Sequence, residues 1–180
     1  MRCAAAVVAL IWPMAAIAQS VTEPEDYRTD EYRGPVPVSV SGGTVIDADA
    51  AFALWKTGRV AFVDVLPQAP KPKGLPEGTI WREKPRLSIP GSIWLPNVGY
   101  GMLAEVTHDY FKKGLKAVTH GDRDYPVVFF CLDECWMSWN AAKRAAGEYD
   151  YTNVFWFPEG TDGWEFEGYP TEELKPEPGF

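Results

Sequence analysis

Short apolar runs alternate with amphipathic stretches along the chain, and this alternation predicts an α/β fold. Nearly every residue is apolar in Val60–Val65, Val127–Phe130 and Val154–Phe157, and Val45-Ile46 is strand-like in the same way. Almost wholly apolar runs of this length are typical of strands buried on both faces of a parallel sheet. We therefore expect a single domain with a central, mainly parallel sheet flanked by helices.

Three stretches between or beside these runs predict helices. Asp47 is placed to cap a helix over Ala48–Lys56, and Thr107 is placed to cap one from 108 to about 118. Trp136–Gly147 is rich in alanine and ends in basic residues and a glycine, as helices commonly do. Helices in these positions would connect consecutive parallel strands.

The two ends of the chain lack such patterns. Residues 1–18 have a basic start, an apolar run and an Ala-Ile-Ala ending, which predict a signal peptide. Residues 19–43 are polar and rich in proline and glycine, and predict an extended N-terminal arm packed on the domain. The domain itself is expected over 44–172, followed by a flexible tail over 173–180.

A long irregular stretch runs from Leu66 to about Pro90 and is loaded with Pro, Lys and Gly. Connections of this length are unusual in compact domains and are typically functional or mobile. A turn and a short strand are expected within 89–96. A second turn at 159–164 leads into a last short helix.

The net charge excludes some classes of partner, and the cysteine count indicates which thiols are open to redox chemistry. The chain has a net charge of −8, which becomes about −9 when Arg2 leaves with the signal peptide. That balance argues against nucleic acid or an anionic membrane as partner, and no later stretch is apolar enough to span a bilayer. Cys3 also leaves, so Cys131 and Cys135 are the two thiols of the mature protein, in an oxidising compartment where redox chemistry is open to them.

The candidate site lies at the loop that begins with Cys131. A cysteine at the C-terminal end of a buried strand, before a loop and a helix, lies where parallel α/β sheets bind ligands. Loop amides and the positive end of the helix stabilise a thiolate, and the same amides could hold the extra sulfur of a persulfide. We predict Cys131 as nucleophile and Cys135 as resolving thiol. The loop residues that would form the amide cradle are Leu132, Asp133, Glu134 and Trp136.

Several segments, in order, resemble those of rhodanese domains. They are the first helix and strand at Asp47–Val65, the Ile-Pro-Gly segment at 89–96, the cysteine-bearing strand at Val127–Cys131, and the closing strand, glycine turn and Gly-Tyr-Pro at 154–170. The resemblance spans about residues 44–172. It implies a rhodanese-like fold with Cys131 at the position of the reactive cysteine.

The cysteine loop departs from that family. A typical rhodanese loop reads C-x-x-G-x-R, whereas Glu134 stands here at the glycine position and Trp136 at the arginine position. Asp133 and Glu134 place two negative charges beside the thiol, which should raise its pKa and repel thiosulfate. Ordinary thiosulfate:cyanide transfer is therefore not expected.

The string Cys-Leu-Asp-Glu-Cys-Trp at 131–136, after a signal peptide and a Tyr-Arg-x-x-Glu-Tyr-Arg arm, narrows the resemblance. It is similar to exported rhodanese-like cysteine–tryptophan motif proteins associated with pyrroloquinoline-quinone-dependent catabolism. That similarity implies a periplasmic protein that supports quinoprotein alcohol oxidation, with a protein of the quinoprotein dehydrogenase system as partner. It leaves persulfide transfer and thiol–disulfide exchange both open, and a small sulfur donor or thiol as a further partner. No organic cofactor is expected.

Two other readings of the cysteines stay open. In a non-enzymatic binding or assembly module, Cys131 and Cys135 would form a permanent structural disulfide. In a copper chaperone they would be soft ligands, but sequence places neither His108 nor His120 near the loop, so we predict no metal site.

We also predict the places of four further residues near the loop or on its helix. Asp64 ends a central strand and would either help to shape the site or cap the amides of a neighbouring loop. Trp136 is expected to wall the site, Trp139 to pack in the core and Arg144 to be a solvated charge near the end of its helix.

Overall fold

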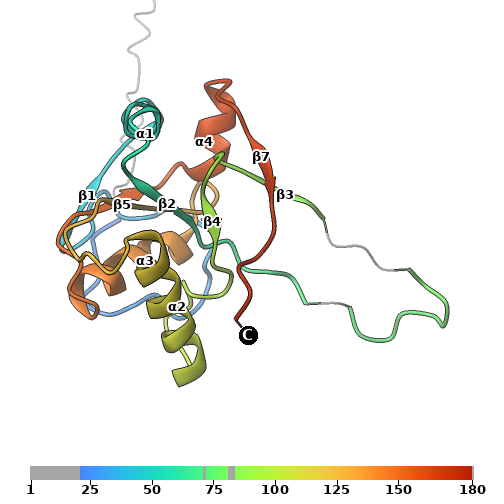
Figure 1. Cartoon of the computed structure of the whole chain (residues 1–180). Helices are drawn as coiled ribbons and strands as arrows, with labels where there is room; N and C mark the ends of the chain where they lie inside the picture. Colours follow the sequence, from blue (N-terminus) through green and yellow to red (C-terminus); the bar gives the residue numbers. More distant parts are fainter. Residues whose placement is uncertain (1–20, 71, 81–83, 180) are drawn as a thin grey trace, which may run out of the picture.

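The computed structural model describes residues 21–70, 72–80 and 84–179, so the predicted signal peptide lies outside the described residues. Within them, the chain forms a five-stranded, wholly parallel central sheet (Figure 1). This confirms the predicted α/β class and the central parallel sheet. The strand order is β1 (Gly43–Val45), β6 (Val154–Phe157), β5 (Val127–Phe130), β2 (Ala61–Asp64) and β4 (Ile93–Trp94).

Helices cover both faces of the sheet because its central strands are apolar on both sides. Residues of α2 (Glu105–Val118) and α3 (Trp136–Gly147) join one buried cluster, in which Phe129 of β5 meets Phe111 edge to face at 5.9 Å. Residues of α1 (Ala48–Lys56) and α4 (Gly160–Phe166) join a second cluster around Phe130 on the opposite face. None of the described helices is long and apolar enough to cross a membrane.

The helix predictions hold for α1 and α3 and are wrong at the start of α2. Asp47 caps α1 as expected, its carboxylate accepting the Ala50 N–H at 2.9 Å. Helix α2 begins at Glu105, three residues before the expected start, and Thr107 lies inside its first turn, where its N–H donates to the Ala104 carbonyl. An acidic residue in the first turn favours the helix N-terminus without a hydroxyl cap.

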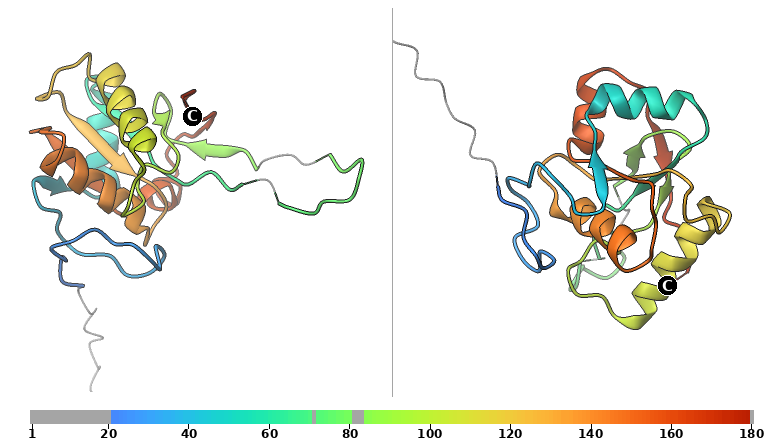
Figure 2. Two further views of the ribbon diagram at one scale, coloured as in Figure 1. Left: turned by 90° about the horizontal axis from the view of Figure 1, so that it is seen from below. Right: turned by 90° about the vertical axis from the view of Figure 1, so that its left-hand side faces the viewer.

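The chain after β2 projects away from the rest of the molecule over residues 72–80 (Figures 1 and 2). Strand β3 (Arg86–Ser88) follows and pairs antiparallel with β7 (Glu172–Leu174). The sequence predicted irregular chain at β3 and a flexible tail from residue 173. The structure differs because these short strands, which carry polar residues, gain order from each other and from contacts with the body rather than from an apolar pattern.

The N-terminal arm lies along α3 (Figure 2). The side chain of Asn140 accepts the Arg28 N–H at 3.0 Å and donates to the Arg28 carbonyl at 2.8 Å. Lys143 donates to the carbonyls of Pro24 and Glu25 at 2.7 and 2.6 Å. Helix α3 therefore has the sheet on one side and the arm on the other.

The arm also explains why the prediction for Arg144 is wrong. This side chain is 1% exposed, and its guanidinium donates to the carbonyls of Val98 and Gly101 and lies 4.1 Å from the ring centre of Tyr27 in the arm. A position near the end of a helix suggests solvent only when nothing else covers it. Here a segment more than a hundred residues away in sequence does.

Candidate functional site: the loop from Cys131 to Cys135

Both cysteines lie at the C-terminal edge of the sheet, where the sequence placed them. Cys131 follows β5 directly, and Cys135 is the N-cap residue of α3. Both are free thiols, Cys131 fully buried and Cys135 2% exposed. Their side chains are hydrogen-bonded to each other. The loop thus holds two sulfur atoms in direct contact, both shielded from solvent.

Cys135 lies in an environment that favours the thiolate. The hydrogen bond from the Cys131 thiol is the largest cause that lowers its pKa from 9.0 to about 7. The backbone N–H groups of Met137 and Leu132 and the charge of Arg33 act in the same direction, against the effect of burial. The positive end of a helix adds to this effect at an N-cap position.

Cys131 lies in the opposite kind of environment. Burial is the main reason that its pKa is well above 9.0, and the hydrogen bond to Cys135 and the charge of Asp64 add to the rise. We had expected the charges of Asp133 and Glu134 to raise this pKa. Both side chains are exposed, and neither is among these causes. The shared proton therefore belongs to Cys131 and the negative charge to Cys135. The nucleophilic role of Cys131 stays a prediction, and these pKa directions favour Cys135 for that role.

The amides predicted to cradle an external anion mostly bind acceptors of the protein itself. The Asp133 N–H donates to the Asp162 carboxylate at 3.0 Å, and the Glu134 N–H donates to the Asp133 carboxylate at 2.9 Å. The Trp136 N–H donates to the Tyr32 carbonyl at 2.9 Å. The amides that do meet sulfur are those of residues 132 and 137. These two amides therefore bind the sulfur of Cys135 and not an external anion.

Asp64 caps a neighbouring loop, one of the two roles that the sequence left open, and its part in shaping the site stays a prediction. It is fully buried and accepts the Leu66 N–H at 2.9 Å, which caps the start of the projecting chain. Its other oxygen accepts the Ser88 hydroxyl and the Arg86 Nε, each at 2.6 Å. Burial raises the pKa of Asp64, and these hydrogen bonds and the charge of Arg86 act against that rise.

Arg86 is a site residue that sequence reasoning missed. Beyond its ion pair with Asp64, its guanidinium donates to the Cys131 carbonyl and to the Thr161 hydroxyl, both at 3.2 Å. The Thr161 N–H donates to the same carbonyl at 3.0 Å. The backbone at Cys131 is therefore held from two separate elements. Arg86 stands in a Pro-rich stretch without periodicity, where only its pairing with Asp64 could have indicated a buried position.

Gly160 allows α4 to approach the loop closely. Its φ is 53°, in the left-handed region that favours glycine, and an added Cβ would lie 2.5 Å from the Cys131 carbonyl oxygen. Glu134 in the loop itself has φ of 50°. The loop is thus tightly wound and closely packed, which fixes the two sulfur atoms relative to α3.

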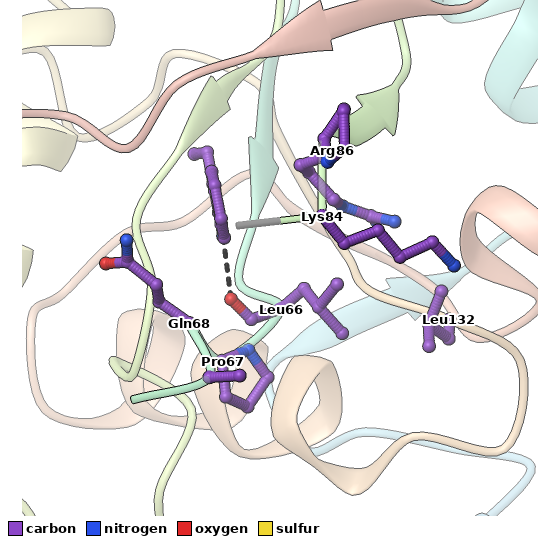
Figure 3. A pocket seen from close by; sticks show the side chains of 9 residues that line it. Leu66, Pro67, Gln68, Lys84, Arg86 and Leu132 are labelled. Atoms are coloured by element: carbon purple, nitrogen blue, oxygen red, sulfur yellow. Dashed lines mark hydrogen bonds between the residues drawn. The ribbon is translucent and has the colours of Figure 1, made fainter. Parts of the chain in front are cut away.

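A cavity of about 240 Å³ lies beside the loop (Figure 3). It is lined by residues 66–69 after β2, by Lys84, Pro85 and Arg86 at the start of β3, and by Trp94 and Leu132. The side chain of Lys84 extends across it toward Leu132 (Figure 3). Neither cysteine is among the residues that line this cavity.

The two tryptophans of α3 differ in surroundings. Trp139 is fully buried, which confirms its predicted place in the core, and its indole N–H donates to the Ser39 carbonyl at 3.0 Å. Trp136 is 4% exposed and packs under Arg28, whose guanidinium lies 5.3 Å from the ring centre. It also lines a hollow beside the arm, so its role as a wall of the site stays a prediction.

The structure does not bring a histidine to the loop. Nδ1 of His108 is hydrogen-bonded to the Tyr149 hydroxyl at 2.6 Å, between α2 and the chain after α3. In the part of the chain that the structure describes, no group of three or more His, Cys, Asp or Glu side chains could hold a metal ion.

The loop offers a thiol whose pKa is lowered to about 7, a second thiol in contact with it whose pKa is raised, and the exposed carboxylates of Asp133 and Glu134. A scan against protein-family models finds no match to this chain, and a search of curated proteins finds no match either.

Proposed function

We propose that the protein carries out thiol–disulfide exchange, with Cys135 as the attacking thiolate and Cys131 as the resolving thiol. One observation supports this most: the sulfur of Cys135, at the N-terminus of α3, accepts hydrogen bonds from the Cys131 thiol and from two backbone amides. The resulting pKa of about 7 is close to ambient pH. Attacking thiols are most effective in that range.

The first step forms a mixed disulfide. The Cys135 thiolate attacks one sulfur of a substrate disulfide, a new S–S bond forms, and the substrate S–S bond breaks. The second substrate sulfur leaves as a thiolate. No electrons have entered or left the pair of molecules at this point, since one disulfide has replaced another.

The second step uses the thiol that the structure keeps protonated. Once Cys135 is in a mixed disulfide, it no longer carries the charge that adds to the raised pKa of Cys131. Cys131 then gives its proton to the departing substrate thiolate and attacks the sulfur of Cys135. The protein ends with a Cys131–Cys135 disulfide and the substrate with one thiol and one thiolate, which takes its proton from solvent, so two electrons have moved to the substrate. The relative reduction potentials set the direction.

The surroundings of the loop support exchange with organic disulfides over sulfur transfer from an anionic donor. Asp133 and Glu134 are exposed on the rim, and Asp162 already accepts an amide that would otherwise bind an anion. Thiosulfate would meet repulsion and few free donors there. The acidic rim therefore favours a neutral or basic partner.

We further propose that this exchange serves an exported, rhodanese-like protein of a quinoprotein alcohol oxidation system. What supports this setting is the signal-like N-terminus, the order of segments that resembles rhodanese domains, and the Cys-Leu-Asp-Glu-Cys-Trp string. The partner would be a periplasmic protein of that system. Reversible disulfide chemistry suits an oxidising compartment.

Alkylation of the reduced protein tests the thiolate assignment. The rate of modification by iodoacetamide is expected to rise with pH through a midpoint near 7, because Cys135 ionises as pH increases through its lowered pKa. Peptide mass spectrometry should place the modification on Cys135. The Cys135→Ser variant should lose this phase. A midpoint near 9, or modification of Cys131 first, would contradict the assignment.

A further inference from the structure

The N-terminal arm crosses the cysteine loop as an added strand would. Arg33 stands opposite Cys135 in an antiparallel bridge. The carbonyl before Arg33 accepts the amide after Cys135, and the amide after Arg33 donates to the carbonyl before Cys135, both at 2.9 Å. Backbone atoms alone make these bonds, so an extended peptide of another sequence can make them as well.

This type of bridge brings the opposed residues unusually close. In a non-hydrogen-bonded antiparallel pair the two Cα atoms are about 4.5 Å apart and the side chains lie on the same face. Disulfides join residues with Cα atoms about 4.4–6.8 Å apart. The charge of Arg33 acts on Cys135, as this geometry requires. A cysteine in the place of Arg33 would therefore have its sulfur within reach of Cys135.

The segment opposite Cys135 meets the loop through two backbone hydrogen bonds and meets the rest of the domain through Tyr32, whose hydroxyl accepts the Gly101 N–H at 3.2 Å. Arg33 and Pro35 are exposed, and a hollow of about 760 Å³ lies beside them, against Trp136. The anchoring hydrogen bonds of the arm lie on either side, at Arg28 and Ser39. Lifting residues 32–34 breaks the two backbone bonds to the loop and the contacts of Tyr32, while the hydrogen bonds at Arg28 and Ser39 keep the arm attached on either side.

We infer that the substrate of the exchange reaction is a polypeptide disulfide, bound as an extended segment in the place of residues 32–34. One half-cystine of that segment stands opposite Cys135, which attacks it while the other half-cystine leaves as a thiolate. The inference rests on the proposed function and adds its substrate class: the arm occupies the substrate's position and must lift from the loop when the substrate binds.

Peptides with and without one backbone N–H test this inference on the full-length Cys131→Ser protein, which stops at the mixed disulfide. Each peptide carries a cysteine as a disulfide with glutathione, followed by alanine or N-methylalanine. The methyl group removes the N–H that would donate to the Glu134 carbonyl. It is expected to slow formation of the peptide adduct by about tenfold, the value of one hydrogen bond. Methylation of the cysteine's own amide, which faces away from the loop, is the matched control.

Release of the arm is the second measurement. Gly34→Pro removes the arm's own N–H donor at a position with φ of 145°, which proline cannot adopt, so residues 32–34 should detach. In the same Cys131→Ser background, this change is expected to speed the reaction of Cys135 with the alanine peptide several-fold. Gly78→Pro, in the projecting chain, is the control and should leave that rate unchanged.

Hydroxyethyl disulfide has no peptide backbone. It therefore tests the exchange reaction separately from the proposed substrate class. If it modifies Cys135 while both peptides react equally fast, or while Gly34→Pro leaves the peptide rate unchanged, the substrate class is wrong and the exchange reaction stands. If hydroxyethyl disulfide does not modify Cys135 in any variant, the exchange reaction itself is wrong.

Discussion

Replacing Cys135 with serine is expected to abolish disulfide exchange, whereas replacing Cys131 with serine is expected to stop it after the first bond has formed. At pH 7 a thiol with a pKa of about 7 is half ionised, while the Cys131 thiol, whose pKa burial raises well above 9.0, stays protonated. Cys135→Ser should therefore react at the background rate. Cys131→Ser keeps a hydroxyl that can donate to the Cys135 thiolate, so Cys135 should still attack. Because this variant has no second thiol to resolve the product, it should accumulate a stable mixed disulfide.

Intact-mass measurement after mixing each reduced variant with hydroxyethyl disulfide would show the difference. The expected adduct mass appears in Cys131→Ser and not in Cys135→Ser, and the unmodified protein converts to the internal disulfide with the loss of two hydrogens. The reverse pattern, an adduct trapped only in Cys135→Ser, would restore Cys131 to the attacking role that its position after the strand predicts. Circular dichroism of both variants would check that the fold is intact.

The sequence predicts well what local patterns determine. The buried strands β5 and β6 and helix α3 fall on the predicted residues, because runs such as Val127–Phe130 have few other ways to bury their side chains. The place of Cys131 at the end of β5 follows directly. Which sulfur carries the charge does not follow, since it depends on how the loop winds and on whose amides point inward.

Contacts between distant parts of the chain account for the rest. Arg86 is buried because Asp64, 22 residues earlier, and the Cys131 carbonyl, 45 residues later, meet it at one point. Arg144 is buried because the arm covers it. A charged residue in irregular chain or near a helix end gives no local sign of such cover. The sequence therefore predicted where the cysteine loop lies in the fold and missed the buried charges that support this loop.

Arg86→Met is expected to destabilise the protein by about 3–5 kcal/mol at neutral pH, the usual cost of removing one partner of a buried ion pair. Asp64 is fully buried, and the variant leaves its carboxylate with only the Ser88 hydroxyl and the Leu66 N–H. Removing Arg86 takes away the largest influence that opposes the raised pKa of Asp64. The carboxyl of the folded variant then protonates more readily, so the loss relative to the unmodified protein should shrink as pH falls and grow as pH rises. Urea unfolding at several pH values measures this.

A double variant separates the ion pair from the packing of the long side chain. Asp64→Asn removes the charge but keeps an oxygen for the Leu66 N–H, so Asp64→Asn/Arg86→Met should be more stable than Arg86→Met alone. Arg59→Met, at an exposed arginine, is the matched control and should change stability by less than about 0.5 kcal/mol. If Arg86→Met unfolds at the urea concentration of this control, the pair contributes nothing to stability.

Because Arg86 also holds the Cys131 carbonyl, the same variant should loosen the loop and bring the pKa of Cys135 closer to 9.0. Stability and thiolate formation would then depend on one buried guanidinium.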